Sequence, residues 1–310
     1  MLLKDPELVG YKPWLKFIWR GHISNWIWRE RTSRRLTRLH HYIEMKMSYL
    51  QKYIDFASNL KAEDTIGNNY DYNDEKIYSL WFQNKENAPH IVKQCLNSIE
   101  KIYGNRFVIL DDKTMHDYIS LPGYIWEKWD KKEICPANFS DIVRIELLYE
   151  HGGYWMDATD YIFRQIPEFI SEADFFMFIT SDKSFIHMFV QTCFLRAKKG
   201  DPLLKMWRDL IFEYWIHERK AIDYFIAHFL LRLLVTYNPE AKKLFDRMPK
   251  RYQDDLHLLW EVNGDKPYNP EIYKEMTEKV FFQKCSYRKQ RHAVNNIIPG
   301  SMADFVINKL

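Results

Sequence analysis

Short apolar runs alternate with longer segments of helical periodicity through the middle of the chain. The runs typical of buried strands lie at 76–82, 106–112, 154–158, 174–180 and 188–197. Residues 90–103 have apolar positions at helical spacing, with Pro89 before them and Gly104 after them, which predicts a helix. A second helix is predicted to end at Gly152-Gly153. Alternating strands and helices predict an α/β sheet in this region.

The chain on either side of this region has a different pattern. From residue 201 onward the periodicity is helical, and a loop-rich, charged tail closes the chain. The helical segments are 202–217, 222–237 and 239–248. Residues 60–75 are acidic and lack apolar periodicity, so we interpret them as a linker. We therefore expect residues 1–70 to form a helical extension and linker, and residues 71–310 to form the main domain.

The composition is that of a soluble globular protein, with 46% apolar and 28% charged residues. The four cysteines are widely spaced and form no Cys-x-x-Cys pair, which argues against a zinc site and a disulfide framework. No apolar run reaches the length of about 18 residues that a membrane-spanning helix needs. Charged residues interrupt the N-terminus where a signal peptide is apolar. These features predict a cytoplasmic protein.

The net charge of +3 is unevenly distributed along the chain. Residues 1–50 hold ten lysines and arginines against four acidic residues, together with four tryptophans. Basic and aromatic side chains suit the headgroup region of an anionic membrane, so peripheral membrane contact through residues 1–50 is one expectation. The alternative is a helical extension packed on the main domain with its charges in solvent. No nucleic-acid-binding motif accompanies the charge, so nucleic acid is not an expected partner.

The second predicted helix and the strand after it bring charged side chains towards one place. A helix that begins near Asp141, capped by Asn138 or Ser140, rises about 16 Å to the paired glycines, and a strand returns about as far. Asp157 is therefore expected beside Asp141 and Arg144, which lie on one helical face at i and i+3. Ligands bind at the carboxyl ends of strands in α/β sheets, so this cluster is a candidate ligand site.

Carboxylates at a strand end suit a divalent cation. Mg²⁺ and Mn²⁺ prefer oxygen ligands, commonly one or two carboxylates together with phosphate oxygens and water. Asp157 and Asp160 are candidate ligands, and Thr159 offers a hydroxyl where an Asp-x-Asp pattern has its second acid. Such a cation would neutralise the diphosphate of a nucleotide sugar as it departs. Taken alone, two acids in such a stretch are also typical of a solvated turn.

Two stretches, SLWFQNKENAPHIVKQCLNSI at 79–99 and ANFSDIVRIELLYEHGGYWMDAT at 137–159, resemble the capsular polysaccharide synthesis glycosyltransferases. They are more distantly similar to the Asp-x-Asp sugar transferases, which include glycosyltransferase family 32 and the glucosylating clostridial toxins. The shared frame is a Trp in the first strand, then Ser-Asp-x-x-Arg and then Gly-Gly-x-x-x-Asp. The resemblance covers residues 76–250. It implies the A-type glycosyltransferase fold, a Rossmann-like nucleotide-binding fold, with an N-terminal helical extension and a C-terminal helical region.

The resemblance implies a role for each residue that matches the frame. Trp81 would stack on the base of the donor. Asp141 and Arg144, with Ser140 beside them, would hydrogen-bond the ribose or sugar of the donor. Asp157 would contact the donor and the water shell of the metal. Asp157, Arg144 and Asp141 are thus the candidate catalytic residues.

The metal position departs from the strict family pattern. Thr159 stands where strict Asp-x-Asp members have a direct metal ligand, which leaves Asp160 as the candidate for that ligand. With the donor site within 76–200, the helical region 201–310 is expected to form the acceptor side.

The implied function is transfer of a hexose from a nucleotide sugar, expected to be a UDP-sugar, to a surface polysaccharide or lipid-linked saccharide acceptor. Retention of anomeric configuration and an Mn²⁺ or Mg²⁺ cofactor are expected with it. An Asp-dependent phosphatase with Asp157 as nucleophile is an alternative, although that chemistry normally has Asp-x-Asp-x-Thr near the start of a domain. A relative that binds the nucleotide sugar without transferring it is a third reading, supported by Thr159.

Other residues have plainer interpretations. His228 lies in an apolar helix and is expected to be a core histidine. Trp81 could be a core residue of its strand, and Arg144 a partner in a structural ion pair. The basic side chains of the tail could close over the diphosphate or remain solvated. These are Arg288, Lys289, Arg291 and His292.

Overall fold

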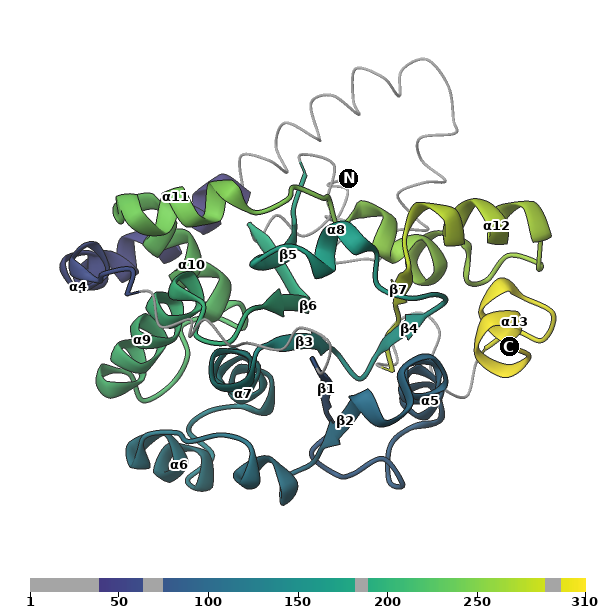
Figure 1. Ribbon diagram of the computed structural model, residues 1–310, viewed down its shortest axis with the longest axis horizontal. Helices are drawn as coiled ribbons and strands as arrows, with labels where there is room; N and C mark the ends of the chain where they lie inside the picture. The colour runs from purple at the N-terminus through teal and green to yellow at the C-terminus, as the bar shows by residue number, and fades with distance from the viewer. Residues whose placement is uncertain (1–38, 64–74, 182–188, 288–296) are drawn as a thin grey trace, which may run out of the picture.

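The computed structural model describes residues 39–63, 75–181, 189–287 and 297–310 (Figure 1). At its centre is a five-stranded sheet with the strand order β2-β1-β3-β6-β5. The strands are β1 (Ile77–Leu80), β2 (Phe107–Leu110), β3 (Gly153–Met156), β5 (Phe175–Ile179) and β6 (Val190–Ala197). β1 is parallel to β2 and β3, and β6 is antiparallel to β3 and β5. Four of these five strands therefore run in one direction, which confirms the predicted α/β class and agrees with a Rossmann-like fold.

Helices cover both faces of this sheet (Figure 1). One side carries α7 (Pro136–His151), α9 (Pro202–His217), α10 (Ile226–Tyr237) and α11 (Pro239–Arg247), and the other carries α5 (His90–Tyr103), α12 (Pro270–Lys279) and α13 (Met302–Asn308). In β3, Trp155 packs into one hydrophobic core while Tyr154 and Met156 pack into the other, because consecutive strand residues point to opposite faces. Strands covered on both faces are mostly apolar, which explains the short apolar runs in the sequence.

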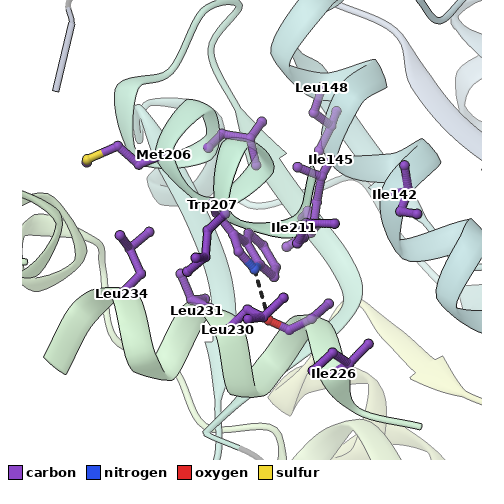
Figure 2. Packing of buried hydrophobic residues seen from close by; sticks show 14 of the residues in the cluster. Ile142, Ile145, Leu148, Met206, Trp207, Ile211, Ile226, Leu230, Leu231 and Leu234 are labelled. Carbon is purple, nitrogen blue, oxygen red and sulfur yellow. Dashed lines mark hydrogen bonds between the residues drawn. The ribbon is translucent and has the colours of Figure 1, made fainter. Parts of the chain in front are cut away.

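The helix that carries two candidate site residues, α7, is fixed by packing against α9 and α10. Figure 2 shows Ile142, Ile145 and Leu148 of α7 beside the side chains of α9 and α10 that surround Trp207. The Trp207 indole Nε1 donates a hydrogen bond to the Ala227 carbonyl oxygen at 2.9 Å, which ties α9 to α10. Burial of each isoleucine or leucine side chain in this cluster stabilises the folded state by about 1.5–3 kcal/mol. The site residues of α7 therefore lie on a helix that is held in place by packing against α9 and α10.

The described part of the N-terminal extension is helical. Residues 39–50 form a helix, followed by a 3-10 turn at Gln51–Tyr53 and by α4 (Ile54–Asn59). α4 packs on α10. The Asn238 side chain caps the start of α11 and also donates a hydrogen bond to the Ala57 carbonyl oxygen at 2.8 Å, so it joins the extension to the helices of the main domain.

Some expectations fall on residues outside the described ranges. Membrane contact through residues 1–50 concerns mainly 1–38, and most of the predicted linker is in 64–74. The basic side chains of the tail fall within 288–296. Among the residues that are described, no helix combines the length and apolar character needed to cross a membrane.

A second, two-stranded sheet joins the middle of the chain to its C-terminal region. β4 (Asp160–Ile162) pairs antiparallel with β7 (Phe282–Lys284). The sequence predicts helices and a loop-rich tail after residue 201, so β7 is a difference from that prediction. A three-residue strand is too short to show a period, and its partner is far away in the sequence. Shorter elements include α6 (Gly123–Asp130), α8 (Glu168–Ser171), 3-10 turns at Gly104–Arg106, Thr114–Asp117 and Asp254–His257, and a π-helical turn at Leu258–Asn263.

The start of α7 corrects the predicted helix boundary. The helix begins at Pro136, after Cys135 as N-cap, and its first turn contains no acidic residue. Proline suits this position because its missing N–H needs no partner in the first turn. Asp141 therefore lies in the second turn, and neither Asn138 nor Ser140 caps the helix.

Candidate functional site

Two neighbouring parallel strands end at the same edge of the sheet, and a candidate residue follows each. Trp81 comes directly after β1, and Asp157 comes directly after β3. The backbone N–H of Trp81 donates to the Leu110 carbonyl oxygen at 2.9 Å, and that of Asp157 donates to the Cys193 carbonyl oxygen at 2.8 Å. The sheet thus fixes both positions at the edge where α/β proteins bind ligands.

Arg144 joins the candidate acids. Its guanidinium lies 3.4 Å from Asp141 Oδ1 and 3.3 Å from Asp157 Oδ1. It also donates hydrogen bonds to the Thr192 carbonyl oxygen at 2.7 Å and to Ser140 Oγ at 3.0 Å. The structure therefore brings these four predicted residues together, although the middle of α7 and not its N-terminus supplies Ser140, Asp141 and Arg144.

Trp155 holds Asp157 on the face that α7 covers. Side chains at i and i+2 of an extended chain point to the same face. Trp155 Nε1 donates a hydrogen bond to Asp157 Oδ1 at 2.8 Å, and the Arg144 guanidinium lies over the Trp155 ring, 5.0 Å from its centroid. The indole therefore orients both members of the Arg144–Asp157 ion pair.

The two carboxylates differ in how readily they ionise. Burial raises the pKa of Asp141 to about 6, although Arg144 acts in the opposite direction. Burial also acts to raise the pKa of Asp157, but Lys284 and Arg144 together hold it below its ordinary value. The Asp157 carboxylate is therefore ionised at neutral pH. Acids whose environments separate their pKa values can take different roles in one site.

A lysine that the sequence analysis did not single out lies inside the turn after β3. Lys284 Nζ donates hydrogen bonds to Asp157 Oδ2 at 2.6 Å and to Thr159 Oγ1 at 2.8 Å, and it lies 3.2 Å from Asp160 Oδ1. Asp160 and Lys284 are direct cross-strand partners in the β4–β7 register, so strand pairing delivers the ammonium. The available signal in the sequence is a lysine shortly after an apolar run, in VFFQKC at 280–285.

The charges of this turn are coupled. Burial raises the pKa of Asp160 to about 8, against the influence of Lys284. Burial acts to lower the pKa of Lys284, but Asp157 and Asp160 raise it above its ordinary value. Lys284 is therefore a cation at neutral pH. Asp160 is completely buried, which keeps its carboxylate from direct contact with a ligand in solvent.

The residues expected to ligate a divalent cation do not fit one as they are arranged. Asp157 Oδ1 accepts from Trp155, Asp157 Oδ2 and the Thr159 hydroxyl accept from Lys284, and Asp160 Oδ2 accepts from the Asp157 backbone N–H at 3.2 Å. A cation on these oxygens would also face the ammonium at short range. Within the described residues, no group of three His, Cys, Asp or Glu side chains is placed to hold a metal ion. The metal role of Asp157, Thr159 and Asp160 stays a prediction.

Trp81 is half-buried, with its indole N–H in the interior. Its ring packs edge-on against Tyr287, with 5.1 Å between centroids and 87° between planes. Trp81 Nε1 is buried and has no hydrogen-bond acceptor among the described residues. A buried indole N–H usually has a partner, so this donor is available to an acceptor on a ligand. Tyr287 was not singled out from the sequence, and no local pattern marks it.

His228 is a core residue, as expected. It is buried on α10, and its Nε2 lies 3.5 Å from Thr192 Oγ1. Burial lowers the pKa of His228 to about 3, helped by the nearby charge of Arg144, so the imidazole is neutral. It supports the β6 residue that accepts a hydrogen bond from Arg144.

Comparison with known proteins places the chain in a family. The model of the capsular polysaccharide synthesis protein family matches residues 25–304, and the chain belongs to this family. The chain is also similar to O-glycosyltransferase braB of Annulohypoxylon truncatum, with 22% identity over 189 residues. That alignment covers 55% of this chain and 44% of the relative, so the chain spans less than half the length of this curated relative.

Proposed function

We propose that the protein is a glycosyltransferase that transfers a hexose from a UDP-sugar to a surface polysaccharide or lipid-linked saccharide acceptor, with retention of anomeric configuration. The observation that carries the proposal is the bridge from Asp141 through Arg144 to Asp157 at the carboxyl edge of β1 and β3. Membership of the capsular polysaccharide synthesis family and similarity to a protein named as an O-glycosyltransferase support the same reaction class.

The donor is held between the ends of β1 and β3 in this proposal. Trp81 stacks on the base, and its buried N–H finds an acceptor on the nucleotide. Asp141 accepts hydrogen bonds from ribose or sugar hydroxyls, and Arg144 donates to their oxygens. The Arg144 side chain is set before the donor arrives, because Thr192 and Ser140 already hold its guanidinium.

The reaction develops negative charge on the departing diphosphate. Arg144 and Lys284 are cations at the end of β3, in a site where the surrounding groups are largely buried. Preorganised charges in such a site stabilise a developing anion more strongly than they would in water. Asp157 keeps both cations in place and does not need to act as a nucleophile. Its two carboxylate oxygens are already engaged by Trp155 and Lys284, which disfavours the phosphatase alternative.

A donor screen tests the proposal. The purified protein is incubated with UDP-glucose, UDP-galactose, UDP-N-acetylglucosamine and p-nitrophenyl phosphate, each with Mn²⁺ and with EDTA, and release of UDP or phosphate is measured. Hydrolysis of a UDP-sugar that Asp157→Asn loses is the expected result. Phosphate release from the ester without UDP release would favour the phosphatase. Tight binding of a donor without turnover under all conditions would favour a relative that no longer transfers sugar.

A further inference from the structure

Three oxygens of one turn surround the Lys284 ammonium. They belong to Asp157, Thr159 and Asp160, at 2.6, 2.8 and 3.2 Å. These are also the oxygens that the sequence pattern offers to a divalent cation. Two of the three ammonium N–H groups donate hydrogen bonds, to Asp157 and Thr159, while Asp160 Oδ1 lies at ion-pair distance without a hydrogen bond. The position that a metal would take between these side chains is therefore filled by a cation that belongs to the chain.

The strand that carries Lys284 is fixed on both sides of it. The Cys285 backbone N–H donates to the Thr159 carbonyl oxygen at 2.8 Å, which continues the β4–β7 pairing past Lys284. Gln283 is completely buried, and its side chain accepts from the Leu259 N–H and donates to the Asp255 carbonyl oxygen, both at 2.7 Å. These buried hydrogen bonds anchor both neighbours, so the backbone that carries Lys284 is held beside the turn.

Part of the Lys284 side chain is nevertheless exposed. The side chains of Lys284 and Asp157 keep 19% and 25% of their surfaces exposed, whereas Asp160 has none. A ligand that reaches Asp157 therefore also meets the charge of Lys284. An anionic group is the chemistry that such a charge recruits.

We propose that Lys284 replaces the divalent cation of this site: its ammonium organises Asp157, Thr159 and Asp160, and supplies the positive charge that faces the diphosphate of the nucleotide. Binding of the nucleoside diphosphate is then independent of added metal. This inference rests on the proposed function, because it takes a nucleoside diphosphate as the leaving group. Lys284 is a positioning residue for Asp157 and a binding residue for the diphosphate.

Isothermal titration with UDP tests the inference on three proteins, the wild type, Lys284→Met and Lys279→Met, each in EDTA and in Mn²⁺. Lys279 is an exposed lysine of α12 paired with Glu275, so Lys279→Met controls for the loss of one positive charge. The UDP affinity of the wild type is expected to differ by less than about threefold between the two buffers, whereas Lys284→Met weakens it about tenfold or more in EDTA. Mn²⁺ is expected to restore binding to Lys284→Met, because the vacated oxygens become free ligands.

The outcomes separate this inference from the proposed function. UDP binding by the wild type that requires Mn²⁺ overturns the inference and leaves the glycosyltransferase proposal standing. Equal affinity of Lys284→Met and the wild type in EDTA overturns it too. If circular dichroism shows that Lys284→Met is unfolded, the UDP affinity of the wild type in EDTA and in Mn²⁺ tests the inference by itself. Absence of UDP binding in both buffers, with no UDP-sugar consumed, overturns the proposed function and the inference together.

Discussion

Two cations lie at opposite ends of β3 and have very different surroundings. At the amino end, Arg196 contacts Glu75 at 2.7 Å, and their side chains are 0% and 2% exposed. At the carboxyl end, Lys284 contacts Asp157 and Asp160, and part of its side chain is exposed to solvent. The first pair is sealed, with one acid for one base. The second shares one ammonium among several oxygens beside another cation. A buried ion pair does not by itself indicate a ligand-binding site. A cluster of several charged side chains that is partly exposed to solvent does.

The sealed pair should matter for stability and not for chemistry. Glu75→Gln leaves the buried Arg196 guanidinium without a counter-charge, and we expect the free energy of unfolding to fall by about 3–5 kcal/mol. Urea denaturation followed by circular dichroism measures this loss. Hydrolysis of the UDP-sugar per folded molecule should stay within about twofold of the wild type, because the pair lies at the far end of the strand from Asp157. A specific loss of turnover in Glu75→Gln would break the comparison.

The open cluster should show the reverse behaviour. Asp157→Asn removes the anion that holds Arg144 and Lys284, and we expect UDP-sugar hydrolysis to fall about 100–1000-fold, in the range found when a preorganised electrostatic contact is lost. Initial rates under saturating donor measure the effect. Asp174→Asn, at an exposed acid paired with Lys198, is the control for loss of charge. Turnover by Asp157→Asn like that of the wild type would remove this residue from the site.

Asp141 should make the stability of the protein depend on pH. Its pKa is raised on folding from 3.8 to about 6, so the native protein holds its proton more tightly than the unfolded chain does. The contribution of Asp141 to stability therefore falls as pH rises from about 4 to about 6, and it is constant above that window. Asp141→Asn removes this fall. The stability of the variant relative to the wild type should rise by about 1–3 kcal/mol across the window.

Unfolding free energies at several pH values measure this difference. Asp55→Asn, an exposed acid of α4, is the control for loss of a carboxylate. Identical slopes in Asp141→Asn and the wild type between pH 4 and 6 would show that Asp141 is not desolvated in the native state.

The smallest effect is expected for Trp81→Phe. Trp81→Phe keeps an aromatic face and removes the indole N–H, so the UDP affinity should fall by about 0.5–1.5 kcal/mol, as for one hydrogen bond. Trp81→Ala removes the face as well, and a loss of about 1–3 kcal/mol is expected. Isothermal titration measures both. Trp126→Phe, in α6, is the matched control. An unchanged affinity in Trp81→Ala would make this residue a plain core residue.

Local signals explain what the sequence could predict. Helices α5 and α9 have the predicted bounds because a proline precedes or begins each one, and a glycine follows α5. Asp141, Arg144 and Asp157 converge because a single helix–turn–strand unit carries them. The sequence predicts too late a start for α7, because the polar residues Asn138 and Ser140 favour a cap, whereas Pro136 already begins the first turn.

The site residues that come from the distant C-terminal region, Lys284 and Tyr287, could not be predicted from local signals. Lys284 contacts Asp157 across 127 positions of sequence, through a strand of three residues. No period is visible in so short a strand, and register between distant strands is set by packing and not by a local pattern. Tyr287 reaches Trp81 from the same segment. The sequence therefore indicates which acids gather, but not which cation they gather around.

A crystal structure of the protein with UDP would show whether the nucleotide binds at the carboxyl ends of β1 and β3. In this crystal structure we expect the uracil base against the Trp81 ring, the ribose near Asp141 and Arg144, and the diphosphate facing Lys284 at the end of β3. UDP bound at another place, with the Arg144 cluster untouched, would contradict this expectation.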